Sequence, residues 1–355
     1  MSSRLLLSLI IFLFSSSLLF SQEDQEKKFP AQITLVYPVG TSGTHSPHTT
    51  YNFSLNALAG VTGSINGCEI GGLLNVNKNN VSGAQVGGIG NLTMGNFNGV
   101  RVGGIFGTSH TFRGVQVNGI LTGTNESEGV LVSGIMNLTK TSNVTIAGIA
   151  NANIKSVHGI QLAGIFNITD KLNGVQIGLI NVVDSVDKGV SIGLVNITRH
   201  DRYQQWSVSF ADYMNTGVNF RSGTKSLYNI YSVGINYIAD PLWVAGLGFG
   251  HISSLGKGFN FQPELTCYTY FPRDFRNIRE TYVMHLKIGF NYELNERFSL
   301  TFAPSIYGAL KSTEGKYEIA GYDQSPIGPI FSSTNRNSNS MLEAGIGFSL
   351  EFCMK

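Results

Sequence analysis

Charged side chains are scarce in this sequence of 355 residues. Asp, Glu, Lys and Arg make up 13% of the chain, about half of the ~25% found in an average soluble domain. The 24 basic residues nearly balance the 22 acidic ones, whereas a nucleic-acid-binding domain carries a clear basic excess. Disorder is also excluded, because 42% of the residues are hydrophobic. We therefore expect a folded protein that does not bind nucleic acid.

Cysteine is rarer still, and the motifs of metal sites are missing. Cys68, Cys267 and Cys353 are odd in number and far apart, which gives neither a disulfide framework nor a zinc-binding spacing. The histidines form no HExxH motif and no paired spacing. They stand at positions 45, 48, 110, 158, 200, 251 and 285. The sequence therefore predicts no metal site.

Catalytic and cofactor motifs are missing as well. No nucleophile elbow occurs. Glu264 and Glu293 have no neighbouring partner for acid–base chemistry, and we expect both to face the inside of a β-structure. The glycines of Gly246–Gly250 are spaced as in a dinucleotide-binding loop, but they lie within an alternating strand pattern with no helix after it. We predict a non-enzymatic protein with no catalytic residue and no cofactor.

One long apolar run is present, from Leu5 to Phe20. Arg4 precedes it and the polar stretch 22–28 follows it, which is the layout of a secretory signal peptide. We place the cleavage after Ser21. An uncleaved membrane anchor is the alternative, but this run is shorter than the ~20 apolar residues that a spanning helix needs. The protein is therefore expected to be exported.

Glycine, by contrast, is abundant, and it marks a repeat. The chain has 43 glycines, well above the average share of ~7%. A short phrase returns about every 15 residues: a Gly or Asn, an apolar–x–apolar triplet, two small residues, an Ile or Leu, and an Asn. Its ten copies begin at residues 52, 67, 83, 99, 114, 129, 143, 159, 174 and 189. The triplet alternates as a β-strand does, and the glycine density excludes a helix.

Two architectures fit these copies. In a β-solenoid each copy is one coil, the two small residues form a corner, and the Ile and Asn positions stack as internal ladders. In a continuous β-barrel each copy is one membrane-crossing strand of about ten residues. The copy at Gly159 alternates as such a strand would, except at Ile165, and a barrel would alternate two kinds of turn over successive copies. These points favour the solenoid.

From about Tyr203 the repeat stops, and a cleaner alternation with many aromatic residues begins. Tyr282 to Leu294 alternates apolar with polar residues, and further strands are expected near 205–212, 231–237, 242–250, 259–270, 298–306 and 342–352. Such strands, with short turns and longer loops such as 312–338, are typical of outer-membrane barrels. Ile33–Tyr37 is a candidate eighth strand that closes the sheet. A soluble antiparallel barrel or sandwich is the alternative, because its strands alternate equally well.

We therefore predict an all-β protein in which glycine-rich β-repeats precede antiparallel barrel-like strands. A signal peptide at 1–21 and an N-terminal segment at 22–51 come first. A ten-copy, β-solenoid-like repeat region follows at 52–202, and the barrel-like domain occupies 203–355. One continuous β-barrel formed by repeats and C-terminal strands together is the alternative fold.

The repeats also resemble a known family. Gly174–Val182 reads GVQIGLINV and Gly189–Ile197 reads GVSIGLVNI, which is similar to the tandem GVQIGLVNV-like units of the bacterial surface-repeat family of spirochaetes and Bacteroidetes. Tyr228–Gly234 and Pro263–Leu265 look like the region that follows the repeats there. The resemblance covers about residues 52–350. It implies a location at the outer membrane or cell surface and no known reaction.

The expected function is accordingly that of a non-enzymatic structural or adhesion-type repeat protein of the outer membrane or cell surface. Its partners would be outer-membrane lipid and a surface ligand that the sequence does not identify. The alternative function is a transport pore, in which the repeats and the C-terminal strands close into one barrel.

Overall fold

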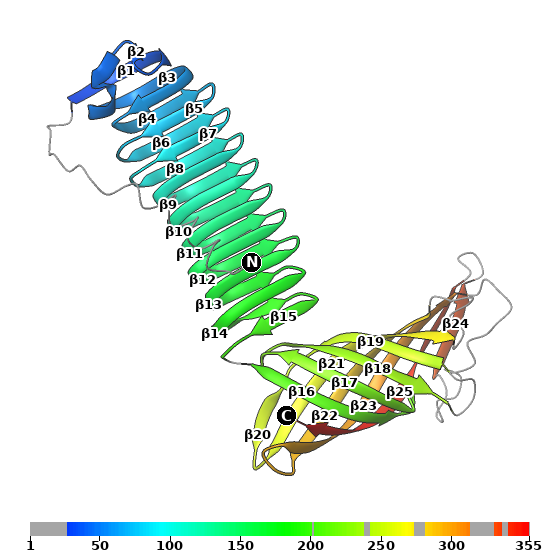
Figure 1. Cartoon of the computed structure of the whole chain (residues 1–355). Coiled ribbons are helices and arrows are strands. Elements are labelled where there is room, and N and C mark those ends of the chain that lie inside the picture. The colour runs from blue at the N-terminus through cyan, green and yellow to red at the C-terminus, as the bar shows by residue number, and fades with distance from the viewer. Residues whose placement is uncertain are drawn as a thin grey trace, which may run out of the picture. The chain divides into compact units, whose positions relative to one another are not determined.

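The computed structural model describes residues 27–200, 202–237, 242–272, 281–312, 330–335 and 340–354 (Figure 1). The expected signal peptide lies outside these residues. The described chain is nearly all β, as predicted, with one short 3-10 helix, η2 (Gly43–His48). Among the described residues no helix is long and apolar enough to cross a membrane. The chain divides into two compact units, Met1–Gly174 and Val175–Lys355.

The repeats form one sheet of 15 strands. These are β1 (Lys27–Val36), β2 (Val39–Gly40), β3 (Thr49–Thr62), β4 (Ser64–Gly71), β5 (Leu74–Asn77), β6 (Val81–Gly87), β7 (Gly90–Thr93), β8 (Phe97–Gly103), β9 (Phe106–Asn118), β10 (Leu121–Ser133), β11 (Met136–Ala147), β12 (Ala150–Ala163), β13 (Phe166–Ile177), β14 (Ile180–Ile192) and β15 (Val195–Thr198). The order is β15–β14–β13–β12–β11–β10–β9–β7–β5–β3–β4–β6–β8. Strands of neighbouring copies pair in parallel, for example β10 with β9 and β11.

Each repeat copy is one coil of a β-solenoid, which confirms the favoured architecture. Val100 pairs with Val115, Val115 with Val130, Val130 with Val144, and Val144 with Ile160. The same position of consecutive copies therefore stacks in one column. Parallel strands need a crossover between them, and the remainder of each coil supplies it. The alternative of one continuous barrel is excluded, since the repeats and the C-terminal strands belong to different sheets.

The segment Ile33–Tyr37, expected as an eighth barrel strand, lies elsewhere, and that prediction is wrong. Most of it belongs to β1, which pairs in parallel with β3 of the repeat sheet, with Ile33 beside Leu55. Polar residues of β1 point into the solenoid, where Gln32 Nε2 donates a hydrogen bond to Ser54 Oγ at 2.9 Å. β1 therefore covers one side of the first repeat strand.

Two columns of glycine let the coils approach closely. Gly99 has a φ of +138°, and an added Cβ would lie 1.9 Å from the carbonyl oxygen of Gly83 in the preceding coil. At the corner of the coil, an added Cβ on Gly104 would lie 1.8 Å from the Gly88 carbonyl oxygen. A side chain does not fit at either distance, so these positions require glycine. This explains why most copies begin with Gly and carry small residues at the corner.

The Asn position of the repeat forms an internal column, as predicted. Asn75, Asn137 and Asn151 are buried. Asn75 Nδ2 donates to Asn91 Oδ1 at 2.9 Å, Asn137 Nδ2 to Asn151 Oδ1 at 2.8 Å, and Asn151 Nδ2 to Asn167 Oδ1 at 3.0 Å. An amide both donates and accepts, so identical asparagines can bond to one another from coil to coil.

The Ile position was expected to form a second internal column, and that prediction is wrong. Ile105, Ile120 and Ile135 are 41%, 42% and 41% exposed. The reason lies in the corner, where the chain bends and the consecutive residues Gly119 and Ile120 are both exposed. The bend interrupts the alternation that a straight strand would keep. The isoleucines therefore stack along the outside of the solenoid.

Within the described residues, the C-terminal strands form a separate antiparallel sheet of ten strands. These are β16 (Tyr203–Ala211), β17 (Thr216–Gly223), β18 (Tyr228–Asn236), β19 (Leu242–Gly250), β20 (Ser253–Gly256), β21 (Phe259–Pro272), β22 (Thr281–Glu293), β23 (Phe298–Ser312), β24 (Phe331–Asn335) and β25 (Ser340–Met354). Eight of them pair in the order β16–β17–β18–β19–β21–β22–β23–β25, and β25 pairs back with β16, for example Phe352 with Val208. The sheet therefore closes into a barrel.

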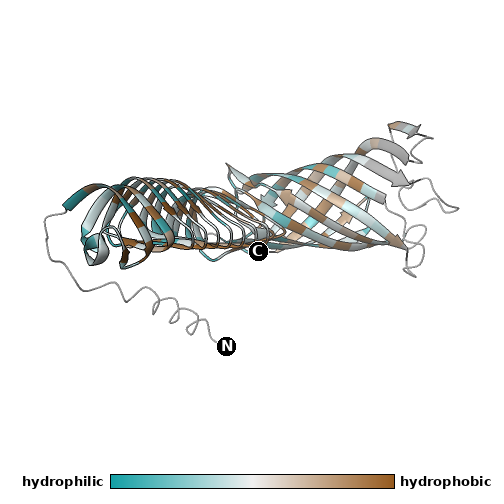
Figure 2. Ribbon diagram, turned by 90° about the horizontal axis from the view of Figure 1, so that it is seen from above, coloured by the Kyte–Doolittle hydropathy of each residue, from teal (hydrophilic) through white to brown (hydrophobic). Residues whose placement is uncertain are grey.

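Seven of these eight strands were predicted, and β17 was missed. The faces of the predicted strands are as expected. On β22, Met284, Leu286 and Phe290 are exposed, whereas His285 and Lys287 are buried inside. Figure 2 shows the resulting alternation of hydrophilic and hydrophobic residues along the barrel strands.

Candidate functional site: apolar surfaces and a charged barrel interior

The outside of the barrel is apolar and rich in aromatic residues. Its exposed aromatic side chains include Trp206, Phe210, Trp243, Phe249, Phe259, Tyr282, Phe290, Tyr292, Phe302, Phe348 and Phe352. Among the strand residues whose side chains are described, no outward position of the barrel carries a charge. A water-soluble monomer rarely exposes an apolar area larger than a few hundred Å². This surface is therefore suited to an apolar surrounding.

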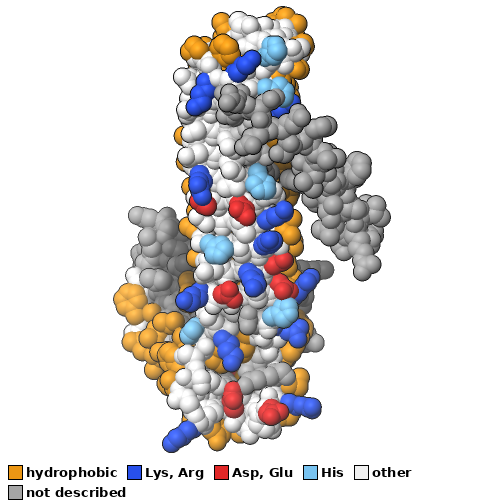
Figure 3. Space-filling view, turned by 90° about the vertical axis from the view of Figure 1, so that its left-hand side faces the viewer, with side chains coloured by type: hydrophobic (Ala, Val, Ile, Leu, Met, Phe, Trp, Pro, Cys, Tyr) orange, Lys and Arg blue, Asp and Glu red, His pale blue; other side chains and the backbone are white. Residues whose placement is uncertain are grey.

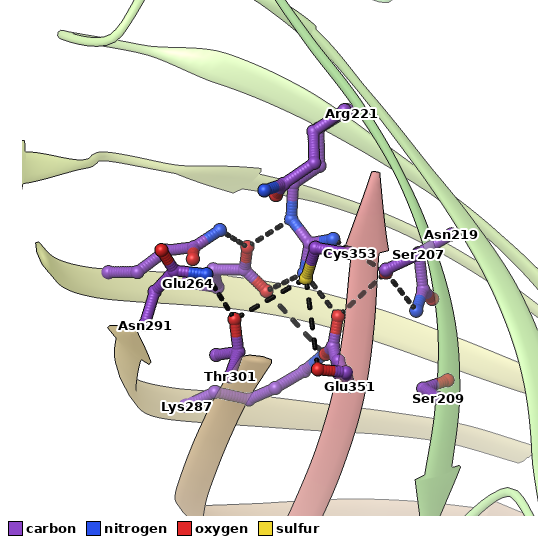
Figure 4. Close-up of polar contacts among 12 residues, drawn as sticks. Ser207, Ser209, Asn219, Arg221, Glu264, Lys287, Asn291, Thr301, Glu351 and Cys353 are labelled. Atoms are coloured by element: carbon purple, nitrogen blue, oxygen red, sulfur yellow. Dashed lines mark hydrogen bonds and ion pairs between the residues drawn. The ribbon is translucent and has the colours of Figure 1, made fainter. Parts of the chain in front are cut away.

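Four charged side chains meet inside the barrel (Figure 4). Arg221 comes from β17, Glu264 from β21, Lys287 from β22 and Glu351 from β25, and none is more than 3% exposed. Arg221 Nε lies 2.7 Å from Glu264 Oε1, and Arg221 Nη2 lies 2.7 Å from Glu351 Oε2. Lys287 Nζ lies 3.6 Å from Glu264 Oε2 and 3.7 Å from Glu351 Oε1. The two cations and two carboxylates form a neutral set.

Neutral side chains form further hydrogen bonds with these charged groups. Tyr228 Oη donates to Glu264 Oε1 at 3.0 Å, and Ser207 Oγ donates to Glu351 Oε2 at 2.8 Å. Arg221 Nη1 donates to Ser207 Oγ at 2.8 Å. Buried ion pairs are tolerated only when such additional hydrogen bonds compensate the loss of water. The network thus ties four strands of the barrel together across its interior.

Aromatic side chains lie on both sides of this charged layer. In one direction along β21, Glu264 is followed by the buried Tyr268 and Tyr270, which pack with Tyr213 and other apolar residues in one cluster. In the other direction, Tyr203 belongs to a second buried cluster, and its ring centroid lies 4.9 Å from that of Tyr228. Eight strands enclose a space that side chains just fill. The charged layer and its aromatic neighbours therefore occupy the barrel interior.

The two predicted inward carboxylates differ in their surroundings. Glu264 lies inside, as expected, at the centre of the charged network. Glu293 lies half-buried at the end of β22, where its Oε1 accepts a hydrogen bond from Asn260 Nδ2 at 3.2 Å. The sequence did not single out Arg221 or Glu351. In each case the sequence shows a single charged residue at an inward position of an alternating strand. Such a residue can be recognised as part of a charged network only when its partners are known.

The cysteines and histidines are dispersed over the fold. The three cysteines are free thiols, and among the described residues no group of three or more His, Cys, Asp or Glu is arranged to hold a metal ion. His285 lies inside the barrel among tyrosines, with its ring centroid 4.3 Å from that of Tyr213. It belongs to the interior packing.

The outside of the repeat region is also apolar. Within Met1–Gly174, three groups of outward positions hold exposed or half-buried hydrophobic side chains. One face carries Val86, Val100, Val102, Val115, Val117, Ile160 and Leu162; the corner carries Leu73, Ile89, Ile105, Ile120, Ile135, Ile149 and Ile165; the other face carries Leu92, Phe106, Met136, Leu138, Phe166 and Ile168. None of these three groups includes a charged residue. We call them together the apolar sides of the solenoid.

The charges of the repeat region gather on the remaining edge. Figure 3 views this edge, along which basic, acidic and histidine side chains are collected. Between residues 52 and 174 it carries Lys78, Arg113, Glu126, Glu128, Lys140, Lys155, Asp170 and Lys171, all exposed. We call it the charged edge. Arg113 and Glu128 pair on it at 2.6 Å.

Two charged residues of the repeats are buried instead. Glu69 accepts hydrogen bonds from the side chains of Asn56, Asn77 and Gln85 at 3.1, 2.7 and 2.8 Å. Burial nevertheless raises the pKa of Glu69 above its ordinary value. Burial lowers the pKa of Arg101 to about 9, although Arg101 Nη2 donates to Thr93 Oγ1 at 2.6 Å. These residues interrupt an interior that is otherwise built from neutral side chains.

No known protein family, no curated protein and no solved structure matches this chain. The resemblance of its repeats to the bacterial surface-repeat family therefore stays a prediction. The features that bear on function are the two apolar surfaces and the filled barrel interior.

Proposed function

We propose that this chain is a non-enzymatic outer-membrane protein whose barrel spans the membrane as an anchor for a structural repeat module. The observation that carries the proposal is the uncharged, aromatic-rich outside of the barrel. Its eight strands range from 8 residues in β17 to 15 in β23 and β25, and a tilted strand of about 9–11 residues crosses a bilayer. Closure of β25 onto β16 removes the free strand edges that lipid does not tolerate.

Sequence features agree with this proposal. A signal peptide at residues 1–21 would send the chain across the inner membrane. The resemblance to the surface-repeat family also implies the outer membrane or cell surface. Lipid of the outer membrane is then the first partner of the barrel.

The experiment is fractionation of cells that express the full chain, followed by gel electrophoresis with and without heating. We expect the protein in the outer-membrane fraction, resistant to carbonate, and with a gel mobility that heating changes, as is common for barrels that stay folded in detergent. Release by carbonate or by high salt alone would overturn the proposal.

The filled interior favours an anchor over a transport pore. The charged layer of Arg221, Glu264, Lys287 and Glu351 ties together strands from opposite parts of the sheet order, and an eight-stranded barrel leaves little room beyond its side chains. We expect no discrete channels when the purified protein is added to planar bilayers. Discrete conductance steps would favour the pore instead.

The connections of the barrel support a direction for the repeats. The chain enters β16 and leaves β25 at the same end, where Trp206 pairs with Met354. The connections at that end are 224–227, 251–258 and 294–297, whereas the longest connection, 313–339, joins strands at the other end. Outer-membrane barrels keep short turns in the periplasm and long loops outside. The repeats, which precede β16, would then stand on the periplasmic side.

This orientation separates a structural role from surface adhesion. A cysteine in place of Lys140 on the charged edge should react with a membrane-impermeant thiol reagent only after the outer membrane is permeabilised. Reaction in intact cells, matched to the level after permeabilisation, would put the repeats outside and favour adhesion.

A further inference from the structure

We propose that the apolar sides of the solenoid contact the acyl chains of a phospholipid leaflet, while the charged edge stays in water. This inference rests on the proposed function only in taking the protein to a membrane. Its basis is a departure from the usual pattern of a soluble protein. Beside a buried apolar column that includes Ile65, Val81, Phe97, Phe112 and Leu131, the repeats hold mainly amides and hydroxyls inside, and they place many Ile, Leu, Val and Phe side chains outside.

The size and shape of the apolar sides fit lipid better than a protein partner. Coils stack at about 4.8 Å, and each face is about four residues wide, so the seven coils from Leu73 to Ile165 give an apolar area on the order of 1,000 Å². That exceeds the few hundred Å² usual for a soluble monomer and the ~800 Å² that each partner buries in a standard interface. The area also extends over two faces and the corner between them. A second copy would cover one side, whereas lipid surrounds all three.

The backbone of the apolar sides meets the main requirement of a lipid environment. In hydrocarbon every backbone N–H and C=O must have a partner within the protein. The strands of both faces pair with the coils before and after them. Even at the corner the bonds run from coil to coil: Ile105 N–H donates to Ile89 O at 2.7 Å, and Ile120 N–H donates to Ile105 O at 2.9 Å. An ordinary loop at this position would leave such groups to water.

The placement of charge gives the orientation. Outside the buried Glu69 and Arg101, every charged residue between 52 and 174 lies on the charged edge. Five basic and three acidic residues are mixed along it, so it is suited to water and to zwitterionic headgroups. Interfacial elements with one apolar and one charged side bury the apolar side by about 5–10 Å. The corner column of Leu73 to Ile165 would point toward the acyl chains.

The test is site-directed spin labelling of the full-length protein in vesicles of phosphatidylethanolamine and phosphatidylglycerol. Cys68, Cys267 and Cys353 are first replaced by Ala. Single cysteines then carry the label at Ile120 on the corner, at Lys140 on the charged edge, or at Leu286 on the outside of the barrel. Accessibility of each label to oxygen, which dissolves in lipid, is compared with accessibility to a water-soluble nickel chelate.

We expect the ratio of oxygen to nickel accessibility at Ile120 to match that at Leu286 and to exceed that at Lys140 several-fold. A ratio at Ile120 equal to that at Lys140 would overturn the inference. So would exclusion of both reagents at Ile120, because it would mean that a protein surface covers the corner. A label at Leu286 that prefers the nickel chelate would overturn the proposed function separately, and the label at Ile120 would still decide the lipid contact.

Discussion

In the repeat region and in the barrel many inward side chains are polar and most outward side chains of the strands are apolar, yet the two interiors are filled differently. The barrel interior holds two cations and two carboxylates, and none of the four belongs to a repeated pattern. The solenoid holds columns of asparagine, which recur from coil to coil. Both arrangements give many buried polar groups a partner, as the interior of a folded protein requires.

The difference follows from symmetry. In a solenoid the neighbour of each interior residue is the equivalent residue of the next coil, about 4.8 Å away. A column of equal charges would repel itself, whereas a column of amides can bond from one to the next. In the barrel each interior residue meets a different strand, so opposite charges can be placed face to face. The repeated interior positions of the solenoid therefore favour amide side chains, whereas the closed barrel allows opposite charges to pair.

The largest effect that tests this comparison is expected in the barrel. Arg221→Met leaves the carboxylates of Glu264 and Glu351 with Lys287 as their one remaining cation in the network. Breaking a buried ion pair costs about 3–5 kcal/mol. The temperature at which heating changes the gel mobility should therefore fall clearly. Arg297→Met, in an exposed turn, is the matched control, and equal behaviour of the two variants would contradict the role of the network.

A slightly smaller effect is expected at a glycine column of the solenoid. Gly104→Ala places a Cβ 1.8 Å from the Gly88 carbonyl oxygen, and the overpacking should cost about 3 kcal/mol. Hydrogen exchange of the segment 97–118, followed by mass spectrometry, should speed up while exchange in the barrel stays unchanged. Gly123→Ala is the control, because its Cβ would meet Thr108 Cγ2 at 3.4 Å. If both variants exchange as the parent does, the close approach of the coils is refuted.

The asparagine column should contribute less per residue. Asn137→Ala removes the donor to Ile146 O and to Asn151 Oδ1 and the acceptor for Ser133 Oγ. Unsatisfied partners of this kind cost about 2 kcal/mol. The loss should show as faster hydrogen exchange in the neighbouring coils. Asn98→Ala, at an exposed position, should leave exchange unchanged, and an effect as large as that of Asn137→Ala would argue against the column.

The smallest effect is expected at Glu69, which places an ionisable carboxyl group in a solenoid interior built mainly from neutral side chains. Because burial raises the pKa of Glu69 above 4.5, its stabilisation is complete below pH 4.5 and is lost as the pH rises through the folded-state pKa. Glu69→Gln does not ionise. The free energy of unfolding of this variant, relative to the parent, should therefore increase between pH 4 and neutral pH. Urea titrations at both pH values measure it, and a constant difference would count against the buried ionisable group.

The sequence predicted what depends on local periodicity. The spacing of the glycines predicted the coils, and alternation predicted seven barrel strands with the correct inward face, including Glu264. The sequence did not predict which strands far apart in the chain pair with one another. The alternation in Ile33–Tyr37 does not reveal that β1 pairs with β3. The short β17, with the charged Arg221 in its middle, is recognised as a strand only from its pairing with β16 and β18.

The corner isoleucines and the charged network illustrate the same limit. A bend at Gly119–Ile120 reverses the direction of the side chains, and nothing in the repeat phrase states where the chain bends. The charged network needs four strands separated by up to 130 residues, the distance in sequence between Arg221 and Glu351. Neither feature has a local signature.

The stacking of equivalent positions affects how the number of repeat copies can change during evolution. Removing or duplicating one whole copy brings a glycine, an asparagine and an isoleucine against the same residues of a new neighbour. Small differences in copy length are taken up as bulges, as between Ser142–Val144 and the paired Val157–Ile160. We therefore expect related genes to differ in the number of copies more than in their spacing, so that unequal recombination lengthens or shortens the stack while the barrel stays as it is.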